Sequence, residues 1–374
     1  MVVIKEVITK KEKKIFATFS VQMYKNVPWA IPDLISDEIN NFNPKKNPAY
    51  DYCEVKQFLA YRDKKCVGRI AGIISHAANE KWDTRRIRFS RVDFIDDYEV
   101  SEALFQAVEN WGRSKGLTQI HGPIGFSDMD QEGMLVEGFE EEGMFITIYN
   151  HPYYINHLAR LGYEKDIDWV EYLVTLPQEP NVRMDLLAEQ VLKRNKVTLI
   201  EPKSRREIKG YISQILQLLN ICYSNLYGTV ELSPALIQKY VDQFILLINP
   251  DYLKLLVNEN KELIGFGLAM PSLNKAVKKH NGRLLPSGWF DLLRVPFAKA
   301  SVLDLYLIGV EPKMQNKGLT AVLMNSMTKT ARENGILFAQ TGPELETNHQ
   351  VQALWKHYET RNHKRRRCFI KTLV

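Results

Sequence analysis

One order of short motifs occurs twice in this chain, and this internal repeat constrains the fold more than any other feature. Each copy reads as a hairpin turn, an apolar strand, a helix that ends at a glycine, a short strand and a Gly-Pro pair. Gly68 and Gly116 of the first copy lie 48 positions apart, whereas Gly265 and Gly335 of the second lie 70 apart. The difference of 22 positions falls in one segment, roughly residues 271–293, that the first copy lacks. Two copies of one α/β unit are therefore predicted.

The length of 374 residues agrees with two domains of ordinary size, each able to bury its own core. A Pro-rich polar stretch at residues 177–181 marks the connection, so the predicted domains are 1–178 and 179–374. Strands alternate with helices in both halves. The predicted fold class is α/β (α+β), with two mixed, mostly antiparallel sheets that are flanked by helices.

A loop in the second copy has the pattern of an anion-binding helix start. An apolar strand over residues 305–310 leads to Gln315-x-x-Gly318-x-Thr320, and a helix follows from Ala321. Gly318 lets the backbone approach a ligand closely, and the first turn of the helix adds free amides and the positive end of its dipole. A pyrophosphate can bind there without a charged side chain.

This loop resembles the acyl-CoA-binding loop of the GNAT acyltransferases, whose pattern is Gln/Arg-x-x-Gly-x-Gly/Ala; Thr320 departs from the last position. The whole chain also resembles an uncharacterised bacterial group of tandem GNAT-like proteins. The residues that carry this wider resemblance are Gly122–Phe126, Gly133–Phe139, Asn150–Tyr154 and Leu161–Lys165 in the first half, and Ile264–Phe266, Ala269–Pro271, Gly282–Leu284, Gly309–Val310 and Gln315-x-x-Gly318 in the second. The resemblance implies two GNAT folds and acetyl-CoA or another acyl-CoA as the cofactor.

The resemblance also implies which residues bind the cofactor. They belong to the strand end, the loop and the next two helix starts: Ile308, Val310, Gln315, Asn316, Lys317, Gly318, Leu319, Thr320 and Asn348. For Asn348, a helix N-cap is the alternative role.

The corresponding loop of the first half differs in its chemistry. It contains no glycine and carries Asp96, Asp97 and Glu99 where a pyrophosphate would lie. Like charges there repel the cofactor, whereas Asp97 or Ser101 suits a helix N-cap. The first domain is therefore predicted not to bind CoA and instead to form a cleft wall or to bind the acceptor.

The predicted activity is acyl-CoA-dependent N-acyl transfer, with acetyl transfer to the amine of a small molecule or a peptide as the expected reaction. The acceptor must lose a proton to attack a thioester, and the candidate bases are Glu231, Asp304 and Glu311. The oxyanion that develops needs a fixed donor, which the Val310 N–H at the strand end can provide.

The departing thiolate takes a proton, commonly from a tyrosine in the GNAT fold. Counting from Asn348 by the usual spacing of the family places Trp355 in that position. Tyr358 lies one helical turn later on a similar face and is the candidate acid. A packed aromatic on an amphipathic helix is the alternative role for Tyr358.

Two other functions stay open. Peptidyltransferases that use aminoacyl-tRNA also pair GNAT-like domains, although their chemistry does not require a CoA-type loop. A non-catalytic sensor that binds acyl-CoA is the other alternative, and Trp355 in the tyrosine position favours it.

Several absences limit the compartment and the partners. Residues 1–20 are rich in Lys and Glu without an apolar run that resembles a signal peptide, and no stretch approaches a membrane-spanning length. The four cysteines form no Cys-x-x-Cys pair, which predicts buried free thiols, and the histidines lack the spacing of a metal site. The sequence predicts a cytoplasmic protein with no metal and no membrane partner.

Positive charge gathers in two segments of a chain whose net charge is +6. The cluster at residues 361–367 lacks interleaved aromatic residues, which favours a final edge strand kept soluble by cations over a nucleic-acid site. The extra segment at 271–293 combines lysines with Trp289 and Phe290. It is predicted to be a lid for an acidic or phosphorylated acceptor, or a cover over the junction between the domains.

Overall fold

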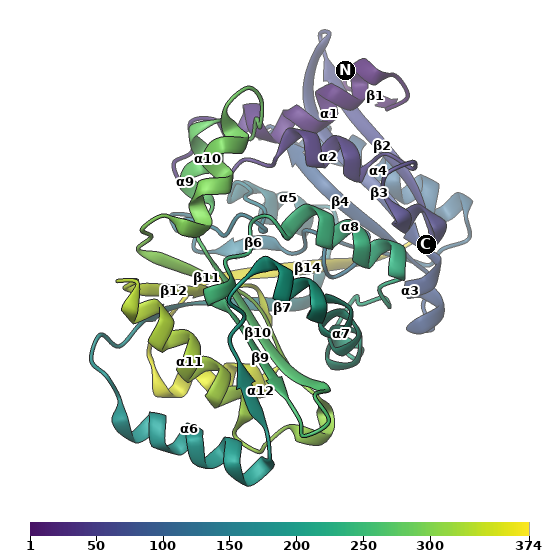
Figure 1. The fold of residues 1–374 in the computed structure, drawn as a ribbon. Coiled ribbons are helices and arrows are strands. Elements are labelled where there is room, and N and C mark those ends of the chain that lie inside the picture. The colour runs from purple at the N-terminus through teal and green to yellow at the C-terminus, as the bar shows by residue number, and fades with distance from the viewer. Residues whose placement is uncertain (374) are drawn as a thin grey trace.

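The computed structural model describes residues 1–373, whose strands join into one 14-stranded sheet with helices on both faces (Figure 1). The strands of the first half are β1 (Val3–Glu6), β2 (Cys53–Arg62), β3 (Lys65–Ser75), β4 (Arg86–Phe94), β5 (Gln119–Gly122), β6 (Met134–Glu137) and β7 (Glu164–Thr175). Those of the second half are β8 (Thr198–Ile200), β9 (Leu253–Val257), β10 (Leu263–Pro271), β11 (Val302–Val310), β12 (Phe338–Thr341), β13 (Glu344–Leu345) and β14 (Glu359–Thr372).

The α-helices of the first half are α1 (Lys10–Met23), α2 (Ile35–Asn41), α3 (His76–Lys81), α4 (Tyr98–Ser114) and α5 (Tyr153–Arg160). Those of the second half are α6 (Val182–Asn195), α7 (Arg205–Tyr223), α8 (Pro234–Phe244), α9 (Asn274–Lys279), α10 (Gly288–Arg294), α11 (Leu319–Glu333) and α12 (His349–Gln352). Short 3-10 helices are η1 (Pro48–Asp51), η2 (Pro250–Tyr252), η3 (Val295–Phe297), η4 (Pro312–Met314) and η5 (Ala353–His357).

The internal repeat is confirmed by the order of these elements. Strand β3, helix α4 and strand β5 of the first half correspond to β10, α11 and β12 of the second. Strands β4 and β5 are parallel neighbours, as are β11 and β12, whereas the other pairings are antiparallel. The predicted mixed, mostly antiparallel architecture is therefore confirmed.

The two halves exchange their final strands. The sheet order is β1-β2-β3-β4-β5-β14-β7-β12-β11-β10-β9-β8, so β14 pairs with β5 and β7 pairs with β12. Figure 1 shows β14, in yellow, crossing from the second half to the strands of the first. The two predicted sheets are thus one continuous sheet. The domain boundary between residues 178 and 179 stays a prediction. Strands β7 and β14 each pair with a strand from the other side of that boundary.

The position of β14 corrects the interpretation of the basic cluster. The strand lies in the middle of the sheet between β5 and β7, not at an edge. Lys364 and Arg366 are buried there, and both face the buried carboxylate of Glu171 on β7. Arg361 pairs with Glu141 at the surface. Lys364 and Arg366 therefore neutralise a buried carboxylate inside the sheet. They do not keep an edge strand soluble, because β14 has a neighbouring strand on each side.

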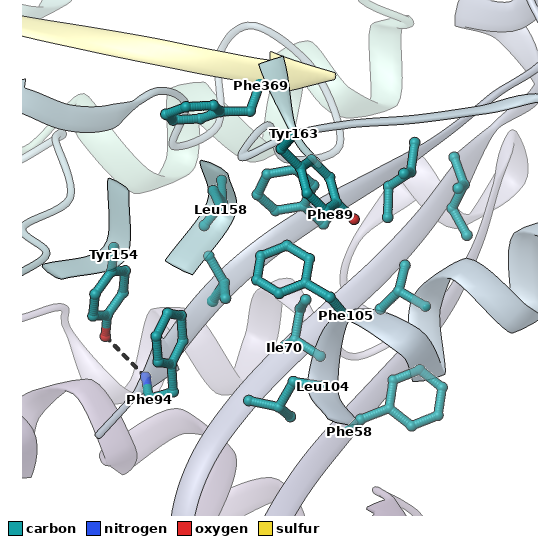
Figure 2. Close-up of a cluster of buried hydrophobic side chains, with 14 of the residues drawn as sticks. Phe58, Ile70, Phe89, Phe94, Leu104, Phe105, Tyr154, Leu158, Tyr163 and Phe369 are labelled. Carbon is teal, nitrogen blue, oxygen red and sulfur yellow. Dashed lines mark hydrogen bonds between the residues drawn. The ribbon is translucent and has the colours of Figure 1, made fainter. Parts of the chain in front are cut away.

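The exchanged strand also completes the core of the first half. Helix α4 packs on β2, β3 and β4 through Leu104 and Phe105, and the Phe105 ring meets Phe89 and Tyr163 in Figure 2. Phe369 of β14 is buried in the same cluster, more than 200 positions along the chain from its neighbours. Folding of the first half therefore depends on the last strand of the chain.

Helices cover both faces of the sheet in the second half. Helix α7 packs against β10 and β11 on one face, and α11 packs against β9, β10 and β11 on the other, with α6 lying against α11. The extra segment forms α9 and α10, which bridge to the first half. The Lys278 ammonium donates to the Pro28 carbonyl at 2.6 Å, and the Ile35 amide donates to the Gly282 carbonyl at 3.0 Å. The extra segment thus covers the junction between the halves.

Candidate active site

A gap between β11 and β12 forms the centre of the candidate site. The two strands pair in parallel from Val302 with Phe338 to Leu305 with Thr341. There β12 ends, and the chain continues into β13, which pairs with β7 instead. Strand β11 continues to Val310 with a bulge at Tyr306, which has no partner on β10. The edge of β11 beyond the bulge therefore faces an opening in the sheet.

Backbone polar groups along this edge point into the gap. The Glu311 amide donates to the Ile264 carbonyl of β10 at 2.8 Å. Because successive residues of an antiparallel strand alternate in direction, the amides and carbonyls of Ile308 and Val310 point the other way. The hydroxyl of Tyr223, at the end of α7, donates to the Ile308 carbonyl at 3.1 Å and lies 3.4 Å from the Ile308 nitrogen. The gap thus holds a hydroxyl and a backbone amide side by side.

The loop after β11 has the conformation that its glycine predicts. Gly318 has a φ of +84°, a left-handed conformation, and caps the start of α11. A Cβ added there would lie 3.1 Å from the Val191 side chain of α6, so a side chain would be crowded there as well as strained by the positive φ. The Gln315 side chain donates to the Val310 carbonyl at 3.1 Å and braces the turn. The first amides of the 15-residue helix α11 have no partner within the helix.

These features fit a pyrophosphate. Asn316, Lys317 and Gly318 are exposed beside the free amides, and the helix dipole is positive at that end. The donor residues inferred from the resemblance, Ile308 to Thr320, therefore form one continuous edge and loop. Asn348 acts as the N-cap of α12 by accepting from the Val351 amide, and it also lines the cavity described next.

A cavity of about 740 Å³ opens from the gap. Its walls are mostly apolar and come from α7, α8, β10, β11 and α11 of the second half. The first half adds the loop at residues 126–132, which carries Asp128, Asp130 and Glu132. Burial raises the pKa of Asp128 to about 6 and raises that of Glu132 well above its usual value. The first half therefore contributes a polar wall to a mostly apolar space.

Asp304 lies on β11 just before the gap, in the part of the strand that still pairs with β12, and its side chain does not line the cavity. Its side chain is fully buried, and its Oδ1 accepts a hydrogen bond from Gln340 Nε2 of β12 at 2.6 Å. Its Oδ2 has no hydrogen-bond partner among residues 1–373. Burial raises the pKa of Asp304 to about 7, in spite of the hydrogen bond from Gln340. The group can therefore exchange a proton near neutral pH.

Glu344 is a second carboxyl group at the gap, on the strand that follows β12. It lines the cavity, and both of its oxygens accept from the indole nitrogen of Trp355 at 2.9 and 3.0 Å. Burial raises the pKa of Glu344 to about 8, in spite of these bonds. Glu344 is therefore largely protonated at neutral pH.

Two sequence candidates lie away from the cavity. The predicted helix over residues 348–358 is α12 followed by the 3-10 helix η5, so Tyr358 leaves the helix and enters the turn before β14. Its hydroxyl lies 3.3 Å from that of Thr328 behind Trp355, and it does not line the cavity. Glu231 is exposed and does not line the cavity either. The structure therefore supports neither residue as a participant in proton transfer.

The equivalent position in the first half is closed. The Phe94 amide at the end of β4 donates to the Tyr154 hydroxyl at 2.8 Å, and the Tyr153 hydroxyl donates to the Phe94 carbonyl. Asp97 caps α4, as its sequence position predicts, and Arg62 pairs with both Asp97 and Glu99. The edge of β4 that would bind an acyl-CoA is thus occupied by the Tyr153 and Tyr154 side chains of the same half.

Sequence analysis missed Tyr223 and Glu344. Glu344 follows the Gly-Pro pair of the repeat, and this position after a short strand is a signal that can be recognised. Tyr223 lies near the end of a long amphipathic helix with no local pattern that separates it from a core aromatic. Only the tertiary contact with Ile308 distinguishes it.

Comparisons with known proteins identify the fold. Residues 212–358 match the model of the Acetyltransferase (GNAT) family. A solved tandem GNAT protein from the clavulanic acid biosynthesis pathway matches 100% of this chain and 99% of its own, with a TM-score of 0.57 and 12% identity. This chain has the tandem GNAT fold, and residues 212–358 belong to the GNAT family. A probable N-acyltransferase from Enterococcus faecalis V583 matches 100% of this tandem GNAT chain and 73% of its own, with a TM-score of 0.53 and 8% identity.

Two curated relatives match most of the tandem GNAT chain. Protein YghO of Escherichia coli strain K12 is 28% identical over 330 residues, which is 87% of this chain and 83% of the relative. The bacterial ceramide synthase of Caulobacter vibrioides is 27% identical over 337 residues, 87% and 84% of the two chains. The chain therefore shares its fold with tandem GNAT proteins, and its residues 212–358 match the acetyltransferase family model.

Within residues 1–373, no group of three or more His, Cys, Asp or Glu side chains is arranged to hold a metal ion. No helix in that range is long and apolar enough to cross a membrane. All four cysteines are free thiols; Cys53 and Cys368 are buried as predicted, whereas Cys66 and Cys222 are partly exposed.

Proposed function

We propose that this protein transfers an acyl group from acyl-CoA to the amine of an acceptor that carries a long apolar chain. The observation that carries the proposal is the gap between β11 and β12, whose free strand edge opens onto an apolar cavity of about 740 Å³. A cavity of that size and lining suits a hydrocarbon chain rather than a small polar amine. The match to a ceramide synthase supports the same class of acceptor, because a ceramide is an amide of a long-chain amine.

The donor would bind along the loop and the strand edge of the second half. The free amides at the start of α11 and the positive φ of Gly318 suit the pyrophosphate, and the edge from Val310 to Ile308 suits the extended arm that ends in the thioester. The thioester supplies an activated acyl carbonyl. Acetyl and longer acyl groups share this mode of binding, since it involves only the CoA moiety.

Asp304 is the proposed general base and Glu344 the proposed general acid. Asp304 lies beside the cavity without lining it, so it takes, through a bridging water, the proton that the amine loses as its nitrogen bonds to the acyl carbon. Glu344 gives a proton to the sulfur as the carbon–sulfur bond breaks, and its pKa of about 8 lies near that of an ordinary thiol. Both carboxyl groups then return to their starting state by exchange with water.

Two hydrogen-bond donors would stabilise the negative charge that develops on the acyl oxygen. The Ile308 amide and the Tyr223 hydroxyl lie 3.4 Å apart at the edge of β11, and burial raises the pKa of Tyr223, which keeps its hydroxyl protonated. In the structure the amide donates to the hydroxyl and the hydroxyl donates to the Ile308 carbonyl, so the acyl oxygen would replace both bonds. Donors held at a strand edge can stabilise such a charge strongly. This assignment uses Ile308 where sequence analysis proposed Val310, two residues along the same edge.

Calorimetric titration of acetyl-CoA and long-chain acyl-CoAs tests the donor site. Gly318→Asp places a negative charge and a side chain at the loop, and we expect binding to weaken by about tenfold or more. Gly335→Asp is the matched control, because Gly335 has a φ of +70° at the other end of α11 and nothing lies near its Cβ position. The control should bind as the wild type does.

The same preparations are then supplied with long-chain amines, and release of the free thiol is measured. Turnover that requires both substrates supports the proposal. Tight binding of acyl-CoA without turnover across many amines would instead identify a sensor. Absence of any acyl-CoA binding to the folded protein would exclude the proposal and favour aminoacyl-tRNA as the donor.

A further inference from the structure

A group of exposed large apolar side chains includes Trp289, which lines the cavity. Its members, which we call the apolar rim, are Leu246, Leu285, Trp289, Phe290 and Phe297. Leu285, Phe290 and Phe297 are 77%, 66% and 63% exposed, although large apolar side chains usually bury most of their surface. Trp289 also lines the cavity, which connects the rim to the proposed acceptor space.

The members of the rim lie on neighbouring elements. Phe290 and Phe297 are seven positions apart along α10 and its continuation η3, which places them on one helical face. The Arg205 guanidinium lies 5.3 Å from the Phe297 ring and donates to the Leu246 carbonyl at 2.7 Å. The start of α7, the chain after α8 and the end of η3 therefore meet at this rim.

All members of the rim except Leu246 lie within a basic segment of the second half. Residues 271–300 contain six Lys or Arg side chains and a single acid, Asp291, in a chain whose net charge is only +6. Asp291 is already compensated, since Lys279 and His280 hydrogen-bond its carboxylate at 2.6 and 2.7 Å. Arg294 and Lys299 are exposed on either side of Phe297. Lys278 is paired with Glu142 of the first half, so the positive charge nearest the exposed rings is that of Arg294 and Lys299.

We infer that the apolar rim docks on the surface of an anionic lipid bilayer. Exposed aromatic and leucine side chains on short helices, flanked by Lys and Arg, match the chemistry of an interfacial anchor. The charge complementarity favours anionic lipids over a neutral apolar partner. A second argument rests on the proposed function: an acceptor with a long apolar chain resides in a bilayer, and Trp289 lies at the passage from the bilayer to the cavity.

Co-sedimentation of the full-length protein with vesicles tests this inference. Vesicles of phosphatidylcholine mixed with phosphatidylglycerol should sediment the wild type, whereas pure phosphatidylcholine should sediment about tenfold less. Phe290→Ser combined with Phe297→Ser should lower the binding by about tenfold or more. Arg294→Glu combined with Lys299→Glu should remove the preference for the anionic lipid.

The matched control changes exposed leucines on a different surface. Leu186 and Leu187 of α6 are 55% and 43% exposed, and Leu186→Ser with Leu187→Ser should leave vesicle binding unchanged. Loss of binding in this control, with binding retained in the Phe290/Phe297 variant, would overturn the inference. Failure of the wild-type protein to sediment with anionic vesicles would also overturn it, including the case in which the protein self-associates through the apolar rim.

Acyl transfer to a water-soluble short-chain amine, measured on the same variants, separates the two proposals. Unchanged transfer by a protein that does not bind vesicles would overturn docking alone. Vesicle binding without transfer to any amine would overturn the proposed function and leave docking supported.

Discussion

Asp304 lies beside the gap and Glu344 lines the cavity, and burial raises their pKa values to about 7 and about 8. The proposed base must be ionised and the proposed acid must be protonated. We therefore expect kcat/KM to rise with pH through about 7 and to fall above about 8. The two groups together give a narrow, bell-shaped profile whose limbs belong to the coupled site.

Single substitutions assign the two limbs of that profile. Asp304→Asn should remove the rising limb and lower kcat by roughly 10²–10⁴-fold, whereas Glu344→Gln should remove the falling limb. Glu231→Gln is the control, because Glu231 is exposed and lies away from the cavity. An unchanged profile in Asp304→Asn would show that another group takes the proton.

Tyr223 offers a second test at the residue scale. Tyr223→Phe keeps the ring and removes the hydroxyl that contacts Ile308, so we expect kcat to fall by roughly 10²-fold. The affinity for acyl-CoA should change little, because the donor binds mainly through its pyrophosphate. Tyr211→Phe on the same helix is the control, and a kcat equal to that of the wild type in Tyr223→Phe would exclude the role in charge stabilisation.

At the scale of elements, strand β14 is held in the sheet by buried charges. Glu171 of β7 is fully buried and faces both Lys364 and Arg366 of β14. Glu171→Gln leaves two buried cations without their anion, which should lower the free energy of unfolding by about 3–5 kcal/mol. Chemical denaturation measures this loss.

Arg361→Ala is the matched control on the same strand. Arg361 pairs with Glu141 but is 56% exposed, so its loss should cost at most about 1 kcal/mol. If Glu171→Gln and Arg361→Ala lowered the free energy of unfolding equally, burial of the β14 charges would not be what stabilises the strand.

At the scale of the whole molecule, the exchange of β7 and β14 makes the halves depend on each other. Fragments 1–178 and 179–374 each contain the last strand of the other half's sheet and lack its partner strands. We expect each fragment alone to lack a cooperative unfolding transition, and an equimolar mixture to regain the circular dichroism of the intact chain. The intact chain should unfold in one thermal transition.

A folded fragment 1–178, with a sharp transition of its own, would contradict this expectation. Phe369→Ala provides an independent check, because Phe369 of β14 is buried in the core of the first half. The substitution should destabilise the protein by about 3–5 kcal/mol. Hydrogen exchange should then show lost protection in β3 and β4, far from the substituted residue in sequence.

Local features of the sequence predicted much of the fold and part of the site. The repeated motifs gave the order of strands and helices because each motif encodes a turn, a cap or a periodicity within a few residues. Gly318 and Asp97 behave as predicted, since a left-handed loop and an N-cap depend on the residue itself. The prediction of an edge strand at residues 361–367 was wrong, because the charges of these residues do not reveal which strands pair with β14.

The sequence by itself determined the repeated α/β unit, the glycine turn that opens α11 and the acidic loop of the first half. Only the tertiary structure decided that the final strands exchange and that Tyr223 contacts the edge of β11. It also decided that the Trp355 indole donates to Glu344, whereas the Tyr358 hydroxyl lies beside Thr328. The physical reason is that turns and caps are set by neighbouring residues, whereas strand partners, burial and the pKa values that burial raises are set by residues distant in the chain.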